Sequence, residues 1–206
     1  MRVLGVDPGS RLMGYGCVDL IGKSVRHVTH GTLRLAHAGG KTVPPFEDRL
    51  LSIYEGLSSI ILEFKPTVLA IEKIFFAKNA VSALKLGHAR GVAIVTGRIF
   101  NLSIAEYSPS EVKLAVVGHG AADKEQVARM VSLLTGQKEF ATFDASDALA
   151  IAICHAHSAG TLGGQSDAYA RALQAASGRR SKKGSSLAEA LGITPESVAG
   201  KRRVRL

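Results

Sequence analysis

The segment TVLAIE (67–72) is apolar at every position between its threonine and its final glutamate. A strand without polar side chains along its length is buried on both faces, as in the middle of a parallel sheet covered by helices. The first segment of the chain, RVLGVD (2–7), has the same apolar character and also ends on a carboxylate. The two segments therefore predict an α/β fold in which buried strands end on acidic residues.

The remaining periodicity predicts a mixed order of strands and helices. Strands are expected over GYGCVDL (14–20) and VRHVTHGTLRL (25–35), joined as a hairpin at IGKS, and over SIAEYS (103–108). Residues 46–64 carry apolar side chains at helical spacing and are followed by Pro66, which ends the helix. A second long helical stretch, 80–100, is expected to be interrupted near Gly87 or Gly91.

Capping signals place the later helices. Ser108, Pro109 and Glu111 form a capping box with proline at the first helical position, and Asp123 with Gln126 forms a similar box. The last helix of the core is expected from Asp144 to about His157. The fold class is therefore α/β, with a mixed β-sheet made of an antiparallel meander plus parallel strands, and helices on both faces.

Length and charge predict one domain and a basic tail. The chain has 206 residues and a net charge of +9; residues 1–157 hold 17 Lys+Arg against 14 Asp+Glu, whereas residues 158–206 hold 9 against 3. The tail contains SGRRSKKGSS and GKRRVRL in a Gly/Ser/Ala-rich context, which predicts disorder. A polyanionic partner is the usual reason for such a tail, and a solvated tail without a partner is the alternative.

No targeting or membrane segment is expected. The N-terminus lacks a signal-peptide pattern, and no apolar run approaches the ~18 residues that span a bilayer. These features predict a soluble, cytoplasmic protein. Cys17 and Cys154 lie in apolar patterns without metal-ligand or redox spacing, which predicts buried thiols in a reducing compartment.

Four acids are distinguished by their context. Asp7 and Glu72 end the buried strands, and ligand sites in open α/β sheets lie outside the carboxyl ends of strands. Asp144 and Asp147 lie one turn apart at a helix start, on one face. Individually, Asp7 is also compatible with a turn, Glu72 with an ion pair and Asp144 with a helix cap. Taken together they predict an oxygen-only site for two Mg²⁺ ions, or Mn²⁺, suited to phosphodiester cleavage.

The motifs that contain these acids resemble one family. GVDPGS with GYG, IEKIFFAKNAVSALKLGHARG, YSPSEVKLAVVGHGAADKEQV and DASDALAIAICHAH are similar, in this order, to the RuvC-type Holliday-junction resolvases, which are crossover junction endodeoxyribonucleases. The resemblance covers residues 1–157 and implies a ribonuclease H-like nuclease domain there. It also implies that Asp7, Glu72, Asp144 and Asp147 are the metal-binding catalytic acids.

The resemblance further implies how DNA is bound. Lys113 and Lys124 match lysines near the scissile phosphate, and Phe75 matches an aromatic residue associated with junction bases. The implied enzyme is a homodimer that nicks two opposed strands of a four-way junction symmetrically, in recombination and repair, together with a branch-migration helicase complex. Because a junction has near two-fold symmetry, one site per chain predicts a two-fold dimer. The small-residue helix 80–94 is the candidate interface, and packing in the core is the alternative explanation of its composition.

Other basic and aromatic residues are weaker candidates. Lys78 and Lys85 are expected on one helix face, with Arg90 extending a basic stripe, although a solvated face has the same pattern. Phe76 competes with Phe75 for the stacking role. His155 and His157 point to different faces of their helix, which makes a shared metal a poor interpretation, and His119 is an unassigned polar candidate.

Two other functions compete with the nuclease. The D-x-G pattern after a first strand also occurs in actin-like and sugar-kinase ATPases, but those enzymes enclose their nucleotide between two such domains, for which 206 residues are too few. A non-catalytic junction-binding module is the other alternative, and the presence of all four acids argues against it.

Overall fold

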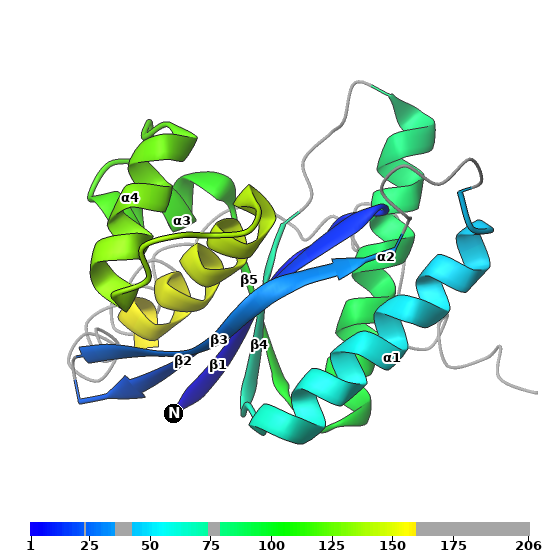
Figure 1. Ribbon diagram of the computed structural model, residues 1–206, viewed down its shortest axis with the longest axis horizontal. Helices are drawn as coiled ribbons and strands as arrows, with labels where there is room; N and C mark the ends of the chain where they lie inside the picture. Colours follow the sequence, from blue (N-terminus) through cyan, green and yellow to red (C-terminus); the bar gives the residue numbers. More distant parts are fainter. Residues whose placement is uncertain (23, 36–42, 74–78, 160–206) are drawn as a thin grey trace, which may run out of the picture. The chain divides into compact units, whose positions relative to one another are not determined.

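The computed structural model describes residues 1–22, 24–35, 43–73 and 79–159, all of which belong to one compact unit, Met1–Gly163. Five strands form one sheet in the order β3-β2-β1-β4-β5 (Figure 1). The strands are β1 (Arg2–Asp7), β2 (Leu12–Ile21), β3 (Ser24–Arg34), β4 (Val68–Glu72) and β5 (Ser103–Tyr107). β1, β2 and β3 form an antiparallel meander, whereas β4 pairs parallel with β1 and with β5, which confirms the mixed sheet.

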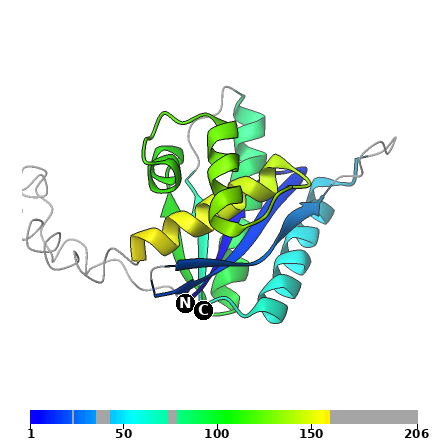
Figure 2. The same ribbon diagram turned by 60° about the vertical axis from the view of Figure 1, so that its left-hand side comes forward.

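Helices cover both faces of this sheet (Figures 1 and 2). The helices are α1 (Phe46–Phe64), α2 (Ala80–Ile99), α3 (Pro109–Val117), α4 (Lys124–Thr135) and a last helix over 143–159. α1 and α2 pack on one face, and α3, α4 and the helix 143–159 pack on the other.

Side chains of the central strands alternate between two apolar layers. Val3 and Ala70 pack in the layer of the helix 143–159, whereas Leu4 and Leu69 pack in the layer of α1 and α2. Both layers are closed to solvent at these strands, since all four residues are buried. This burial explains why RVLGVD and TVLAIE are apolar on both faces.

The helix ends follow the sequence signals. α1 ends at Phe64, and Lys65 caps it in the left-handed conformation with φ 52° immediately before Pro66. The capping boxes of Ser108 with Glu111 and of Asp123 with Gln126 are both formed. Local hydrogen-bonding chemistry therefore placed these boundaries correctly.

The predicted interruption of the second long helix is wrong. α2 runs without a break from Ala80 to Ile99. Each glycine in a helix interior costs about 1 kcal/mol relative to alanine, which is too little to break a helix that is packed elsewhere. Ala89 and Ala93 supply that packing, because both are completely buried against the sheet.

The two cysteines are buried free thiols, as predicted. Burial raises the pKa of Cys17 and of Cys154 to about 12, which removes the reactive thiolate at neutral pH. In the described part of the chain, no helix has the length and apolar character needed to cross a membrane. The basic tail lies outside the described residues, so its disorder stays a prediction.

Candidate functional site

Asp7 and Glu72 lie side by side at one end of the sheet. β1 and β4 are parallel neighbours that pair in register up to Val6 and Ile71, and the two acids come next on each strand. Side chains alternate along a strand, so both carboxylates project into the layer of the helix 143–159. Each is only partly buried. The strands therefore hold two carboxylates at the rim of the core.

The helix 143–159 provides the other two acids. Asp144 and Asp147 lie in its first turns and are both partly buried. The helix begins at residue 143, and Thr142 Oγ1 accepts a hydrogen bond of 3.3 Å from the backbone N–H of Ala145. Thr142 therefore acts as the cap, and the alternative reading of Asp144 as a helix cap is wrong.

Glycines bring this helix close to the strands that carry the acids. A Cβ added at Gly5 of β1 would overlap the carbonyl oxygen of Ala148 and lie 2.7 Å from the backbone nitrogen of Ala152. A Cβ added at Gly14, which pairs with Asp7, would overlap the carbonyl oxygen of Asp144. The backbone of the helix thus rests directly on the backbone of β1 and β2.

A cavity of about 330 Å³ opens where these elements meet. Its lining combines acids, lysines and apolar side chains: Asp7, Glu72, Asp147, Lys113, Lys124, Pro109, Val112, Val127, Ala150 and Ile151. Asp144 does not line the cavity, but its charge acts on both Asp7 and Asp147. The structure therefore brings three of the predicted acids around one cavity, with the fourth close enough for electrostatic coupling.

The acids raise one another's pKa. Burial, and then repulsion from Asp147, Glu72 and Asp144, raises the pKa of Asp7 to about 8. Burial followed by repulsion from Asp147 raises the pKa of Glu72, and burial also raises the pKa of Asp147. A positive charge placed among them would reverse these shifts.

Two lysines supply part of that positive charge. Lys124 Nζ lies 3.5 Å from Asp147 Oδ2, and its side chain is 74% exposed. Lys113 lowers the pKa of Glu72 from the other side of the cavity. Lys124 is also the first residue of α4, where free backbone N–H groups favour an anion. The cavity thus has acidic and basic side chains in one lining.

The donor chemistry at this site fits a hard divalent cation. All four acids offer oxygen ligands, which Mg²⁺ and Mn²⁺ prefer, and their mutual repulsion would be relieved by such an ion. Within the described residues, no three His, Cys, Asp or Glu side chains are grouped so that they could hold a metal ion. The fit of this site to a divalent cation therefore rests on the type of its donor atoms and on its negative charge.

Comparison with known proteins identifies the family. The sequence profile of the family described as crossover junction endodeoxyribonuclease RuvC matches residues 3–155. The chain belongs to the RuvC family. The crossover junction endodeoxyribonuclease RuvC of Syntrophotalea carbinolica is 54% identical over 157 residues, which are 76% of this chain and 94% of that protein.

Solved structures agree with this membership. RuvC of Thermus thermophilus, in a complex with a Holliday junction substrate, superposes with a TM-score of 0.71 at 33% identity, over 78% of this chain and 95% of the other. The yeast mitochondrial Holliday junction resolvase Ydc2 shares the fold with a TM-score of 0.56 at 15% identity, over 75% of this chain and 77% of the other. This RuvC-family chain therefore has the ribonuclease H-like fold that its motifs predicted.

The other residues that were predicted to contact DNA do not form one continuous basic stripe in the described part of the chain. Phe75, Phe76 and Lys78 lie outside the described residues. Lys85 is exposed on α2. Arg90 does not extend a basic stripe with Lys85, because its guanidinium faces the sheet.

That guanidinium already has partners. Arg90 Nε donates to the carbonyl oxygen of Glu72 at 3.1 Å, and Nη2 pairs with Glu106 at 2.6 Å. The ion pair with Glu106 occupies one of its terminal nitrogens. The contacts of Arg90 instead stabilise the end of β4 that carries Glu72.

Tyr107 and His155 form a contact that the sequence reasoning missed. The Tyr107 hydroxyl lies 2.7 Å from His155 Nδ1, at the junction between β5 and the helix 143–159. The sequence did contain a signal for Tyr107, because this residue ends β5 just as Glu72 ends the neighbouring strand β4. His155 and His157 do face different partners, as predicted, since His157 Nδ1 meets the carbonyl oxygen of Ala115 at 2.9 Å.

Proposed function

We propose that this RuvC-family chain is a metal-dependent endonuclease that resolves four-way DNA junctions in recombination and repair. The observation that carries the proposal is the cavity that Asp7, Glu72 and Asp147 line together with Lys113 and Lys124. A Thermus thermophilus member of the family was solved with a Holliday junction substrate, which supports the same substrate class here.

Asp7, Glu72, Asp144 and Asp147 would hold the metal, which we propose to be two Mg²⁺ ions with Mn²⁺ as a substitute. Bound there, two such ions would neutralise the carboxylates and supply Lewis-acid assistance to an in-line displacement at phosphorus. Asp7 would have to lose its proton to act as a ligand, because burial and the neighbouring acids raise its pKa to about 8.

The lysines act on the DNA rather than on the metal. Lys113 and Lys124 line the cavity beside the acids, where an ammonium group can hold the scissile phosphate and stabilise negative charge on its oxygens. Lys124 leaves its contact with Asp147 at little cost, because an exposed ion pair contributes less than about 1 kcal/mol.

Substitution of Asp7 tests the proposal directly. Asp7→Asn should abolish nicking of a synthetic four-way junction in Mg²⁺, because it removes one ligand, whereas junction binding should persist, since the basic residues remain. A gel assay with junction and linear duplex measures both properties. Cleavage by Asp7→Asn at more than a few per cent of the parent rate would exclude this role, and a parent protein that binds junctions but cuts none would support the non-catalytic module.

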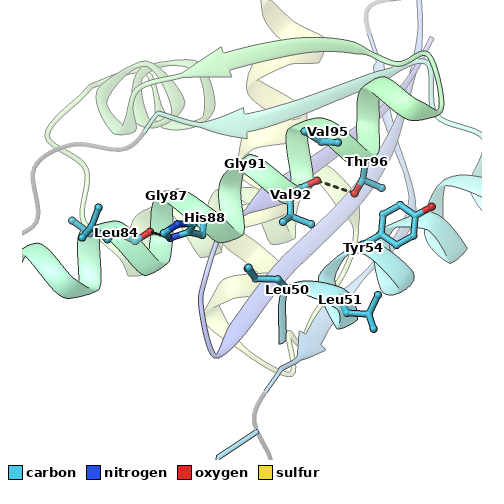
Figure 3. Close-up of a pocket in the computed structure, with 11 residues that line it drawn as sticks. Leu50, Leu51, Tyr54, Leu84, Gly87, His88, Gly91, Val92, Val95 and Thr96 are labelled. Carbon is cyan, nitrogen blue, oxygen red and sulfur yellow. Dashed lines mark hydrogen bonds between the residues drawn. The ribbon is translucent and has the colours of Figure 1, made fainter. Parts of the chain in front are cut away.

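We also propose that the chain acts as a homodimer through the face opposite the catalytic cavity. A hollow of about 760 Å³ lies between α1 and α2 and is lined by Leu50, Leu51, Tyr54, Ala83, Leu84, Gly87, His88, Gly91, Val92, Val95 and Thr96 (Figure 3). Three of its aliphatic side chains are more than half exposed: Leu51 at 54%, Leu84 at 64% and Val95 at 58%. An apolar surface of this kind favours an interface, and the near two-fold symmetry of the junction requires paired sites.

Sedimentation of two variants tests the dimer. Leu84→Asp, which places a charge on the exposed apolar lining of the hollow, should shift the protein to monomer at micromolar concentration and reduce paired nicking. Leu62→Asp is the matched control, because Leu62 is equally exposed on α1 and does not line the hollow. A parent protein that is monomeric with and without junction would contradict the dimer.

The remaining predicted contacts belong to the same proposal. Phe75, Lys78, Lys85 and Arg90 are proposed to meet junction DNA. Arg90 would do so from its ion pair with Glu106. A branch-migration helicase complex is the proposed partner upstream of cleavage, and the cytoplasm is the proposed location. Lys85→Ala should weaken junction affinity without changing the cleavage rate at saturating enzyme.

A further inference from the structure

Tyr107 is joined to the strand end that carries Glu72. β4 and β5 are parallel, and Glu72 pairs in register with Tyr107. The backbone N–H of Lys73 donates to the carbonyl oxygen of Tyr107 at 2.8 Å, which continues the ladder by one residue beyond Glu72. The backbone of Tyr107 therefore holds the position of the Glu72 main chain.

The side chain of Tyr107 reaches the helix that carries the other acids. Its hydroxyl lies 2.7 Å from Nδ1 of His155, and the two rings meet edge to face with centroids 5.9 Å apart. His155 lies about three helical turns beyond Asp144, on the same side of the helix 143–159. One hydrogen bond thus connects the end of the sheet with the face of the helix that carries acids.

The chemistry of the two groups suits a hydrogen bond between them. Burial lowers the pKa of His155 and raises the pKa of Tyr107, so both groups are neutral near pH 7. A neutral imidazole has one acceptor nitrogen and one N–H, and the phenol has an O–H to donate and an oxygen that accepts. In the arrangement proposed below, Tyr107 donates to Nδ1 and His155 carries its proton on Nε2.

We propose that Tyr107 and His155 are positioning residues for the metal-binding acids. Their hydrogen bond determines how the helix 143–159 lies against the ends of β4 and β5, and therefore how far Asp144 and Asp147 stand from Glu72. Neither residue lines the catalytic cavity, so they act through the acids and not on the DNA. The inference rests on the proposed metal-binding role of those acids.

Tyr107→Phe tests this role in the full-length protein. The variant keeps the aromatic ring and removes only the hydroxyl. Loss of a partner that orients metal ligands typically costs 10- to 100-fold in metal affinity or activity, so we expect roughly a tenfold weaker Mn²⁺ affinity by calorimetry and a roughly tenfold slower single-turnover cleavage. Junction affinity without divalent ions should stay unchanged. The ¹⁵N spectrum of the imidazole should show the Nε2–H tautomer of His155 in the parent and a mixture of tautomers in the variant.

A conservative rescue separates positioning from general support of the fold. In His155→Asn the side-chain amide oxygen can replace Nδ1 as acceptor, so this variant should keep most of the parent's metal affinity and cleavage rate. His155→Leu has no acceptor and should behave like Tyr107→Phe. Tyr15→Phe is the matched control, because it removes the same hydroxyl group from the layer of α1 and α2. Its metal affinity and cleavage should equal those of the parent.

Two results would overturn the inference. The first is a Tyr107→Phe protein with parent metal affinity and cleavage. The second is a parallel loss of metal affinity, junction affinity and melting temperature that His155→Asn does not restore, because that pattern indicates only a damaged fold. Asp7→Asn in the same series distinguishes a failure of this inference from a failure of the proposed function. If Asp7→Asn still cleaves junctions, the metal-binding role of the acids is wrong, whatever Tyr107→Phe does.

Discussion

The Asp7 carboxyl is protonated at neutral pH when no cation is present, since its pKa in the folded chain is about 8 and its ordinary value is 3.8. Between these two pH values the folded state holds a proton that the unfolded state releases. The free energy of unfolding of the metal-free protein therefore falls as the pH rises from about 4 to about 8. Each pKa unit corresponds to about 1.4 kcal/mol, so the penalty at pH 8 amounts to a few kcal/mol.

Asp7→Asn should remove this penalty. In the presence of a chelator the variant should melt at a higher temperature than the parent, by roughly 5 °C or more at pH 8 and by much less at pH 5. Thermal melts across that pH range measure the difference. Equal melting temperatures of the parent and Asp7→Asn at pH 8 would show that the ionised Asp7 carboxylate does not destabilise the folded chain.

Asp19 provides a control of opposite sign. Hydrogen bonds from Arg2 and Arg26 lower the pKa of its carboxyl to about 2, and Arg2 Nε lies 2.8 Å from Oδ1. A lowered pKa stabilises the folded chain above pH 4, and this contribution is lost as the pH falls through about 2. Asp19→Asn should therefore destabilise the protein at pH 7 and converge with the parent in acid.

The two lysines that line the cavity should affect the rate of the chemical step. Loss of one charged contact to the reacting phosphate costs on the order of 2 to 4 kcal/mol in activation free energy, by analogy with oxyanion donors. Single-turnover cleavage by Lys113→Ala and Lys124→Ala at saturating enzyme measures that cost. If both variants lost affinity alone and kept the parent rate, their role would be limited to holding DNA.

At the scale of elements, the contact between β1 and the helix 143–159 leaves no room for a side chain at Gly5. In Gly5→Ala the new methyl group meets backbone atoms of Ala148 and Ala152, which cannot rotate away. The helix must shift, at about 1 to 3 kcal/mol for overpacking, and it carries Asp144 and Asp147 with it. We expect a lower melting temperature and a roughly 100-fold slower cleavage, since a displacement of about 1 Å at a reacting centre costs that much.

Gly120→Ala is the corresponding control. A Cβ at Gly120 would make ordinary contacts, the nearest at 3.5 Å from the carbonyl oxygen of Ser110. Its melting temperature and cleavage rate should match those of the parent. Parent-like cleavage by Gly5→Ala would instead mean that the helix can shift without moving its acids.

At the scale of the whole molecule, we predict that the basic tail sets the non-specific affinity for DNA. Its clustered charges are Arg179, Arg180, Lys182, Lys183, Lys201, Arg202, Arg203 and Arg205. Each phosphate that these residues neutralise adds roughly 0.9 to the slope of log affinity against log salt on duplex DNA. Because this attraction does not depend on DNA structure, it strengthens binding to duplex as much as to junctions.

A chain that ends at Ala159, the last described residue of the final helix, should still cut junctions in low salt. Its salt slope should be shallower than that of the full chain, and it should distinguish junction from duplex at least as well. Affinities for both DNAs across a salt series measure these properties. Unchanged slopes would show that the tail does not touch DNA, and a loss of junction preference would show that it recognises structure.

The sequence by itself determined the elements whose signals are local. Hydrophobic alternation marked β1 and β4, and hydrogen bonds within four residues defined the caps at Ser108 and Asp123. Asp7 and Glu72 were identified in the same way, because each is the one carboxylate in a six-residue apolar segment and ends that segment. The two lysines could be named from sequence only through the family motifs.

Tertiary structure alone decided the contacts between residues far apart in the chain. The packing of Ala89 and Ala93 keeps α2 continuous through Gly87, and Glu106 draws Arg90 toward the sheet. The same holds for Tyr107 and His155, which are 48 residues apart. The free energy of such contacts depends on which surfaces meet, and the periodicity of a single segment carries no information about its partner.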